Sequence, residues 1–348
     1  QSDPVSRGKR SVAVNLKSPA GLEAVRALAS KSDVFIEPFR PGVAEKLGLG
    51  PTELCAANPR LIYARMTGYG QGGDPKFERL AGHDANYLSL SGALSLFRRF
   101  NESPSPPANF AGDYAGGGMM MAMGVLLALL EREKSGKGQI VDAAMVDGAN
   151  YVALPLFKWV QSGFMPTRED GQIDTQKSIL HQAPPWVQIY ECKDGKWVSV
   201  QAIERHFYDL LVQGLGLSSE KLPKQGDQST WPWMRERFAT IFRRKTRDEW
   251  AKVFYGVDAC VVPVLTTTEA AVHPHNVKRG SFAPTPESPG LFEPAPAPKL
   301  SRTPGFAPRP RPTPGGDTLQ VLKDYGFSDE AVAALLKSGA VTDDRSKL

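Results

Sequence analysis

The first third of the chain alternates short apolar runs with amphipathic stretches. Ser11–Leu16, Val34–Glu37 and Leu61–Met66 are short runs of the kind that forms β-strands. A helix is predicted from Ser18 through Ala29, with Ser18 as N-cap and a proline in the first turn, and another follows Pro51. Strands that alternate with helices predict a Rossmann-like α/β domain, in which helices cover both faces of a parallel sheet.

Ligands of parallel sheets bind at the carboxyl ends of the strands. The segments Glu37–Pro41 and Thr67–Gly70 follow two of the predicted strands. They are therefore candidate ligand loops on topology alone.

The longest apolar run, Met119–Leu130, is shorter than the roughly 20 residues that a membrane span requires. We expect it to lie in a buried helix over Gly117–Glu133, ended by Ser135-Gly136. No membrane partner is expected. The next apolar segment, Ile140–Val146, is either a strand or the start of a further helix.

The second half of the chain changes character near Trp186. Tyr190–Val200 predicts a β-hairpin with its turn at Asp194-Gly195, and helical stretches follow from Arg205 to Phe254. The proline-rich segment Ser281–Gly316 excludes regular helix and central strand, so it is predicted to be extended. Two short helices are then predicted, over Asp317–Tyr325 and Ser328–Lys337.

These patterns divide the chain into successive parts. They are a large α/β domain (1–150), a linker helix and loop (151–185), a small α+β domain (186–280), a proline-rich linker (281–316), and C-terminal helices with a terminal signal (317–348).

Composition narrows the class of protein. The 348 residues carry a formal net charge of +5, but there is no Lys/Arg stripe interleaved with aromatic residues, so nucleic acid is not an expected partner. The three cysteines, Cys55, Cys192 and Cys260, lack the spacing of a disulfide framework or a metal site. Cys260 lies among valines and is expected to be an inert core thiol.

The C-terminal tripeptide Ser346-Lys347-Leu348 is a peroxisomal address at the only position where the import receptor reads it. We therefore expect a peroxisomal protein that binds this receptor.

Two segments carry candidate chemistry: Ala81–Tyr87, with His83 followed by Asp84, and Gly112–Gly118, with Asp113 before a glycine triplet. A histidine and a carboxylate are suitable for a two-base proton-transfer site. Each also has a structural interpretation, His83 as a core or loop histidine and Asp113 as a turn or helix-cap residue. The triplet Gly116–Gly118 is at best weak evidence for a phosphate cradle.

Several segments, in this order along the chain, resemble the α-methylacyl-CoA racemases within the family III CoA-transferases. They are Glu37–Val43, Leu61–Gly70, Ala81–Tyr87, Gly112–Gly118, Gly136–Gly148, Ala202–Glu204, Phe207-Tyr208 and Asp258–Leu265. The resemblance implies a racemase that removes and returns the α-proton of a 2-methylacyl-CoA, without metal or other cofactor. It also implies an interlocked homodimer whose C-terminal helices return to the large domain.

The resemblance assigns roles by position. His83 and Asp113 are the two catalytic bases, and Glu204 pairs with His83. Asp84 is either a loop cap or a partner that supports the catalytic residues. The expected contacts of the acyl-CoA are Arg40, Tyr63, Ala64, Arg65, Met66, Gly68, Tyr69, Asp84 and Tyr87, together with Lys137. Arg40 and Arg65 match phosphate in fork geometry, although either is equally typical of an ion pair.

Alternatives remain at this stage. In the transferase branch the matching aspartate is a nucleophile, so a CoA-transferase using Asp113 is one rival. A truncated, inactive acyl-CoA-binding relative is another, because the family normally begins earlier, with a strand, a helix and a strand that supply part of the sheet and the CoA pocket. The segment 178–183 also lacks the family's two glycines, and its His181 is expected to be an unrelated surface residue rather than a substrate contact.

Overall fold

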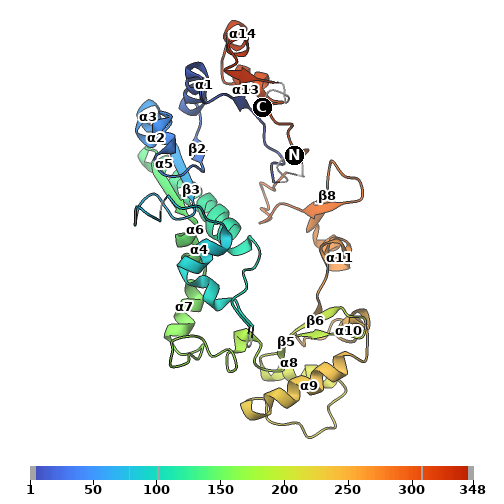
Figure 1. The fold of residues 1–348 in the computed structure, drawn as a ribbon. Helices are drawn as coiled ribbons and strands as arrows, with labels where there is room; N and C mark the ends of the chain where they lie inside the picture. Colours follow the sequence, from blue (N-terminus) through green and yellow to red (C-terminus); the bar gives the residue numbers. More distant parts are fainter. Residues whose placement is uncertain (1–4, 78, 100–101, 307–308, 344–348) are drawn as a thin grey trace. The chain divides into compact units, whose positions relative to one another are not determined.

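A computed structural model describes residues 5–77, 79–99, 102–306 and 309–343 (Figure 1). The chain forms two compact units. The first comprises the residues up to Tyr87, Asn109–Ala149 and the chain from Thr267 on; the second comprises Leu88–Ala108 and Asn150–Thr266.

A parallel three-stranded sheet organises the first unit. Its order is β2 (Val34–Glu37), β3 (Ile62–Thr67) and β4 (Ile140–Ala144). Helices α1 (Pro19–Ser30) and α3 (Pro51–Ala57) cover the face that carries Tyr63. The predicted strands at β2 and β3 and both predicted helices are confirmed, as is the parallel sheet.

Helix α5 (Met120–Ser135) covers the opposite face of this sheet. A Cβ on Gly124 would lie 2.8 Å from a methyl of Val141, and Ala128 and Arg132, four and eight residues further on, are buried. The helix ends at Gly136, whose φ of 75° is left-handed, as the sequence predicted. Residues 140–146 contain both of the expected elements, because α6 (Met145–Val152) follows β4 directly.

Two expectations for this helical region are wrong. The helix starts earlier than Gly117, since a π-helical stretch η2 (Phe110–Met119) runs straight into α5. It is also mostly exposed: Met119, Leu126 and Leu130 are 69%, 61% and 65% exposed, because in the described residues only one stripe of α5 meets the sheet. By length and composition Phe110–Ser135 would suffice to cross a membrane, with mean hydropathy 1.4 in its most apolar 18 residues.

The predicted strand over residues 11–16 is shorter and lies elsewhere. Only β1 (Ala13–Val14) forms, and it pairs antiparallel with β10 (Val341–Thr342) instead of joining the parallel sheet. The C-terminal helices α13 (Thr318–Asp324) and α14 (Asp329–Lys337), both predicted, hold it there. The Ala13 N–H donates to Thr318 Oγ1 at 3.0 Å, and Val14 packs against the buried cluster of these helices.

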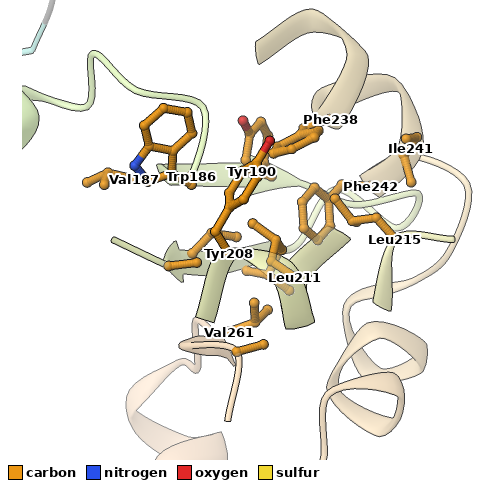
Figure 2. Packing of buried hydrophobic residues seen from close by; sticks show 14 of the residues in the cluster. Trp186, Val187, Tyr190, Tyr208, Leu211, Leu215, Phe238, Ile241, Phe242 and Val261 are labelled. Carbon is orange, nitrogen blue, oxygen red and sulfur yellow. The ribbon is translucent and has the colours of Figure 1, made fainter. Parts of the chain in front are cut away.

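The second unit is built on an antiparallel sheet of β5 (Val187–Glu191), β6 (Trp197–Gln201) and β7 (Val261–Pro263). The predicted hairpin is confirmed, with Gly195 in its turn at φ 71°. Helices α8 (Arg205–Gly214), α9 (Trp231–Phe242) and α10 (Arg247–Val253) complete the core. Figure 2 shows its aromatic centre, where the rings of Tyr190 and Phe242 stack at 4.8 Å.

The remaining elements are short. They are α2 (Val43–Lys46), α4 (Asp84–Ser91), η1 (Ala93–Leu96), α7 (Leu154–Gln161), η3 (Ile179–His181), η4 (Gln228–Thr230), α11 (Thr267–Val272), α12 (Pro274–Arg279), β8 (Phe282–Pro284) and β9 (Phe292–Pro294). The last two pair antiparallel inside the proline-rich segment, whose described residues otherwise form turns, bends and irregular chain without a helix, as predicted.

Candidate active site

A pocket of ≈ 320 Å³ lies at the carboxyl ends of the parallel strands in the first unit. This is the edge at which the topology predicted ligand loops, and both loops contribute to it. Its lining consists of Pro38, Arg40, Pro41, Met66, Thr67, Gly68, Tyr69, Leu80, Ala81, Gly82, His83, Tyr87 and Met145.

His83 lines this pocket, and its backbone is fixed by the start of α4. Its N–H donates to the Asn86 side-chain oxygen at 3.0 Å, and its carbonyl accepts from the Asn86 N–H at 2.8 Å. The bond from the His83 N–H to the Asn86 side chain matches one half of a capping box, and the backbone bond closes the first turn of the helix. The residue itself is exposed, so an anchored backbone presents a solvent-accessible imidazole.

Asp113 lies in the first turn of η2 rather than in a turn ahead of the helix, because the helix already begins at Phe110. It is half-buried, and its Oδ2 accepts a hydrogen bond from Asn109 Nδ2 at 2.7 Å. The first turn of a helix stabilises negative charge through the helix dipole.

Asp84 connects the segments that carry His83 and Asp113. Its Oδ2 accepts from the backbone N–H groups of Gly112 at 2.7 Å and Asp113 at 2.8 Å. A Cβ on Gly112 would lie 2.7 Å from the same oxygen, so only glycine permits this approach. Asp84 is 3% exposed. Of the two interpretations from the sequence, the geometry favours a partner that supports the segment carrying Asp113.

Two tyrosines form a wall of the pocket. The rings of Tyr69 and Tyr87 meet edge to face at 5.1 Å, and the Tyr87 hydroxyl donates to the Gly82 carbonyl. A Cβ on Gly68 would lie 2.1 Å from the Tyr87 ring, so this glycine is required by the packing. Burial raises the pKa of Tyr87, and the nearby phenol of Tyr69 and carboxylate of Asp113 raise it further.

The glycine triplet serves helix packing. A Cβ on Gly116 would lie 2.6 Å from the Ala149 nitrogen, and one on Gly148 would lie 1.8 Å from the Gly116 carbonyl oxygen. Gly117 faces Met145 and Met66, which line the pocket. The triplet thus lets η2 and α6 cross in contact behind the pocket, and the geometry gives no support to a phosphate cradle.

Of the expected CoA contacts, Arg40, Met66, Gly68, Tyr69 and Tyr87 line the pocket. Tyr63 and Ala64 are each 0% exposed within β3. The Tyr63 hydroxyl donates to the Leu49 carbonyl at 2.8 Å. These two residues offer no side-chain surface through which the predicted CoA contact could act.

Arg65 is buried in an ion-pair network. Its Nε donates to Glu37 Oε1 at 2.7 Å and its Nη1 to Glu45 Oε1 at 2.8 Å. The second Glu37 oxygen accepts the Phe39 N–H at 2.7 Å, which ties the network to the loop carrying Arg40. The geometry favours the ion-pair interpretation of Arg65 over a phosphate contact, and leaves Arg40 as the cation in the pocket lining.

Lys137 lies at the amino ends of the parallel strands, opposite the pocket. It precedes β4, and the neighbouring Gly138 N–H donates to the Pro59 carbonyl at 2.7 Å, just ahead of β3. Because β4 is 5 residues long, Lys137 is about 17 Å along the strand from the pocket. It does not belong to this pocket.

Glu204 lies in the second unit, as the exposed N-cap residue of α8. The thiol of Cys260 is close enough to sense its charge: burial raises the pKa of Cys260, and Asp258 and Glu204 add to the effect. Cys260 has a left-handed backbone, with φ 52°, and is half-buried instead of forming part of the core. The pairing of Glu204 with His83 stays a prediction.

His181 is buried, contrary to the surface position expected. Its Nδ1 lies 2.8 Å from Ser178 Oγ and its Nε2 lies 3.1 Å from the Leu96 carbonyl oxygen. Burial lowers its pKa. The loop without the family's glycines is therefore held to η1 by an internal histidine.

Among the described residues no group of three or more histidine, cysteine or acidic side chains is arranged to hold a metal ion. Two residues of the site, Asn86 and Asn109, were not predicted from the sequence. Asn86 stands three residues after His83, the spacing of a capping box, and Asn109 stands four before Asp113, one helical turn. Both spacings are visible in the sequence once the helix starts are known.

The profile of CoA-transferase family III matches residues 3–318. The chain belongs to this family. Within it, the alpha-methylacyl-CoA racemase of Mus musculus is 46% identical over 344 residues, which are 99% of this chain and 88% of the mouse protein. The Homo sapiens alpha-methylacyl-CoA racemase is 44% identical over 354 residues, covering 99% and 87% of the two chains. The predicted resemblance is confirmed.

Solved structures of family III proteins share the fold. A CaiB/BaiF family protein from Brucella suis superposes with a TM-score of 0.77 over 92% of this chain and 82% of its own, at 23% identity.

A more distant sequence relative is the succinyl-CoA–L-malate CoA-transferase beta subunit of Chloroflexus aurantiacus. It is 32% identical over 349 residues, which cover 94% of this chain and 81% of that protein. The relatives of this chain thus include proteins named for isomerisation and for group transfer.

Proposed function

We propose that this chain is an α-methylacyl-CoA racemase that interconverts the 2R and 2S epimers of 2-methylacyl-CoA thioesters, as in the oxidation of branched-chain fatty acids or bile-acid-type side chains. The observation that carries the proposal is the pocket-lining histidine, His83, in a chain 44–46% identical to two racemases over 99% of its length. No metal or redox step is needed for this chemistry.

The reaction balances with the residues present. One base takes the C2 proton, the C–H electron pair moves into the thioester carbonyl to give an enolate, and the second base returns a proton to the other face of C2. His83 and Asp113 are the two bases. Asp84, which follows His83 in the chain, accepts the Asp113 N–H and so joins the two segments that carry them directly.

Arg40 supports the binding of an anionic CoA thioester. Among the predicted CoA contacts it is the cation in the pocket lining, and its Nη1 lies 3.4 Å from the Arg79 carbonyl oxygen at the edge of that lining. A guanidinium there matches phosphate oxygens in fork geometry. Tyr69 and Met66 add an apolar wall for the pantetheine and acyl portions.

The test is incubation of the purified protein with a 2-methylacyl-CoA in heavy water. Deuterium at C2 with loss of stereochemical purity supports the racemase. Exchange of the acyl group between CoA and a free acid, without deuterium at C2, would instead establish a transferase with Asp113 as nucleophile. If neither reaction is observed, the remaining interpretation is an inactive relative that binds acyl-CoA.

We also propose that the chain works as a homodimer. The exposed apolar side chains of η2 and α5 support this, since a second copy would cover them: Phe110 and Met119 are 72% and 69% exposed. Light scattering at micromolar concentration should give twice the mass of the chain. A stable and active monomer would exclude the proposal.

The proposed location is the peroxisome, through recognition of Ser346-Lys347-Leu348 by the import receptor. These residues lie outside the described part of the chain. An N-terminally fluorescent protein should colocalise with peroxisomes and should stay in the cytosol once Leu348 is deleted. Absence of the intact protein from peroxisomes would end this proposal.

A further inference from the structure

Asp84 makes contacts that its neighbours in the pocket lining do not. One oxygen of its carboxylate accepts both the Gly112 and Asp113 N–H groups, while the other, Oδ1, is buried and has no hydrogen-bond partner in the described residues. The side chain follows His83 in the sequence and reaches a backbone 29 residues further on. It is the direct link between the two segments that carry the bases.

We infer that Asp84 is a positioning residue for Asp113. The inference rests on the proposed function and deepens it, since it says how a two-base site keeps its second base in place. A helix start fixed only by its own chain frays easily, because the first four N–H groups have no partner within the helix. Here a buried carboxylate from a different segment holds two of them, those of Gly112 and of Asp113 itself.

The residues next to Asp84 leave room for this contact. Gly112 is buried and has no Cβ to push the carboxylate away. On the other side, Asn86 holds the backbone of His83 in the same short segment. Asp84 therefore holds the backbone of Asp113, and Asn86 holds the backbone of His83.

This division predicts opposite kinetic defects in matched variants. Asp84→Ala frees the Asp113 backbone and should slow deuterium exchange about tenfold to a hundredfold for the epimer that depends on Asp113, with a smaller loss for the other epimer. Asn86→Ala should show the reverse preference. Asp84→Asn keeps a carbonyl oxygen in the place of Oδ2 and should restore the ratio between the epimers toward that of the native protein.

Amide hydrogen exchange gives a readout that does not need activity. In Asp84→Ala the Gly112 and Asp113 amides should lose protection, while in Asp84→Asn and Asn86→Ala they should keep most of it. If Asp84→Ala does not fold, Gly112→Ala disturbs the same contact, because its Cβ would press on Asp84 Oδ2. It should show the same epimer preference and the same loss of protection.

The outcomes separate the inference from the proposed function. If the native protein incorporates deuterium into neither epimer, the proposed function is wrong. Amide hydrogen exchange then decides by itself whether Asp84 holds the Asp113 backbone. Unchanged amide protection in Asp84→Ala overturns the positioning role. Equal slowing of both epimers in a folded Asp84→Ala does so as well.

Discussion

The guanidinium of Arg65 and the carboxylate of Glu37 meet at 2.7 Å inside the first unit, where the side chains are 8% and 1% exposed. The two residues are directly paired in the parallel register of β2 and β3. This pair fixes the start of the loop that carries Arg40, because the same carboxylate also accepts the Phe39 N–H.

Substitution should separate the two arginines by role. Arg65→Ala leaves Glu37 buried without its charge partner and should lower the free energy of unfolding by about 3–5 kcal/mol. Arg40→Ala should change it by less than about 0.5 kcal/mol, yet raise KM for acyl-CoA. Denaturant unfolding and steady-state kinetics measure both quantities.

Glu45→Gln serves as the matched control for this network. Glu45 also pairs with Arg65, but its side chain is 42% exposed, so its loss should cost less than that of Glu37→Gln. A stable Arg65→Ala whose only defect is weak CoA binding would reinstate the phosphate contact predicted from the sequence.

The two proposed bases should differ by epimer. His83→Ala should slow exchange from one pure epimer about 10²–10⁴-fold more than from the other, since a positioned base contributes this much, and Asp113→Ala should show the reverse. Glu204→Gln should imitate the His83 defect more mildly, if it orients the imidazole. Deuterium incorporation under single-turnover conditions measures each case. Full activity in His83→Ala would remove the main reason for preferring a racemase to a transferase.

The glycines of η2 provide a test of packing. Gly116→Ala inserts a methyl 2.6 Å from the Ala149 nitrogen and should cost about 1–3 kcal/mol of stability or more. Gly118→Ala meets nothing closer than 3.8 Å and should be neutral or stabilising by up to about 1 kcal/mol. Thermal unfolding compares them. Equal stabilities with equal losses of CoA affinity would point back to a phosphate cradle.

His181 should make the second unit sensitive to acid. Because burial lowers its pKa below 6.5, the unfolded chain takes up a proton that the folded chain does not. Its contribution to stability is therefore full above about pH 6.5 and falls as the pH drops below that value, by at most about 1.4 kcal/mol per pH unit. His181→Gln should flatten this slope in denaturant titrations between pH 5 and 7.5.

The exposed His206 on α8 is the control for that slope. His206→Gln should leave the pH dependence as it is in the native protein. An unchanged slope in His181→Gln would show that His181 is not the group responsible.

The sequence predicted those features that depend on neighbours along the chain. Strand β3 is an apolar run bounded by turns, and the parallel arrangement follows from its alternation with helices; the ligand loops at the strand ends follow in turn. Features set by distant partners were missed. Residues 13–14 are a plausible strand of the parallel sheet until their partner at 341–342 is known. Lys137 lies at the amino ends of the strands, whereas the pocket lies at their carboxyl ends.

Charge and burial were the least predictable quantities at the site. Arginine is a typical phosphate contact, and only the positions of Glu37 and Glu45 in space show that Arg65 is already paired. The helix was predicted to start at Gly117, whereas it begins at Phe110, and the close crossing with α6 at Gly116 could not be read from local sequence. His181 was misjudged because its acceptor, the Leu96 carbonyl, lies 85 residues away.

The pairing of β1 with β10 has a consequence for the order of events during synthesis. The first unit is not closed until Val341 and Thr342 leave the ribosome, whereas the sheet and helices of the second unit are complete by Val261–Pro263. Domains generally fold as they emerge, so the second unit should fold while Val14 and Leu28 still await their apolar partners. A chain that stalls within the proline-rich segment would therefore carry one finished unit and one open core, a state that chaperones and proteases distinguish readily from the native protein.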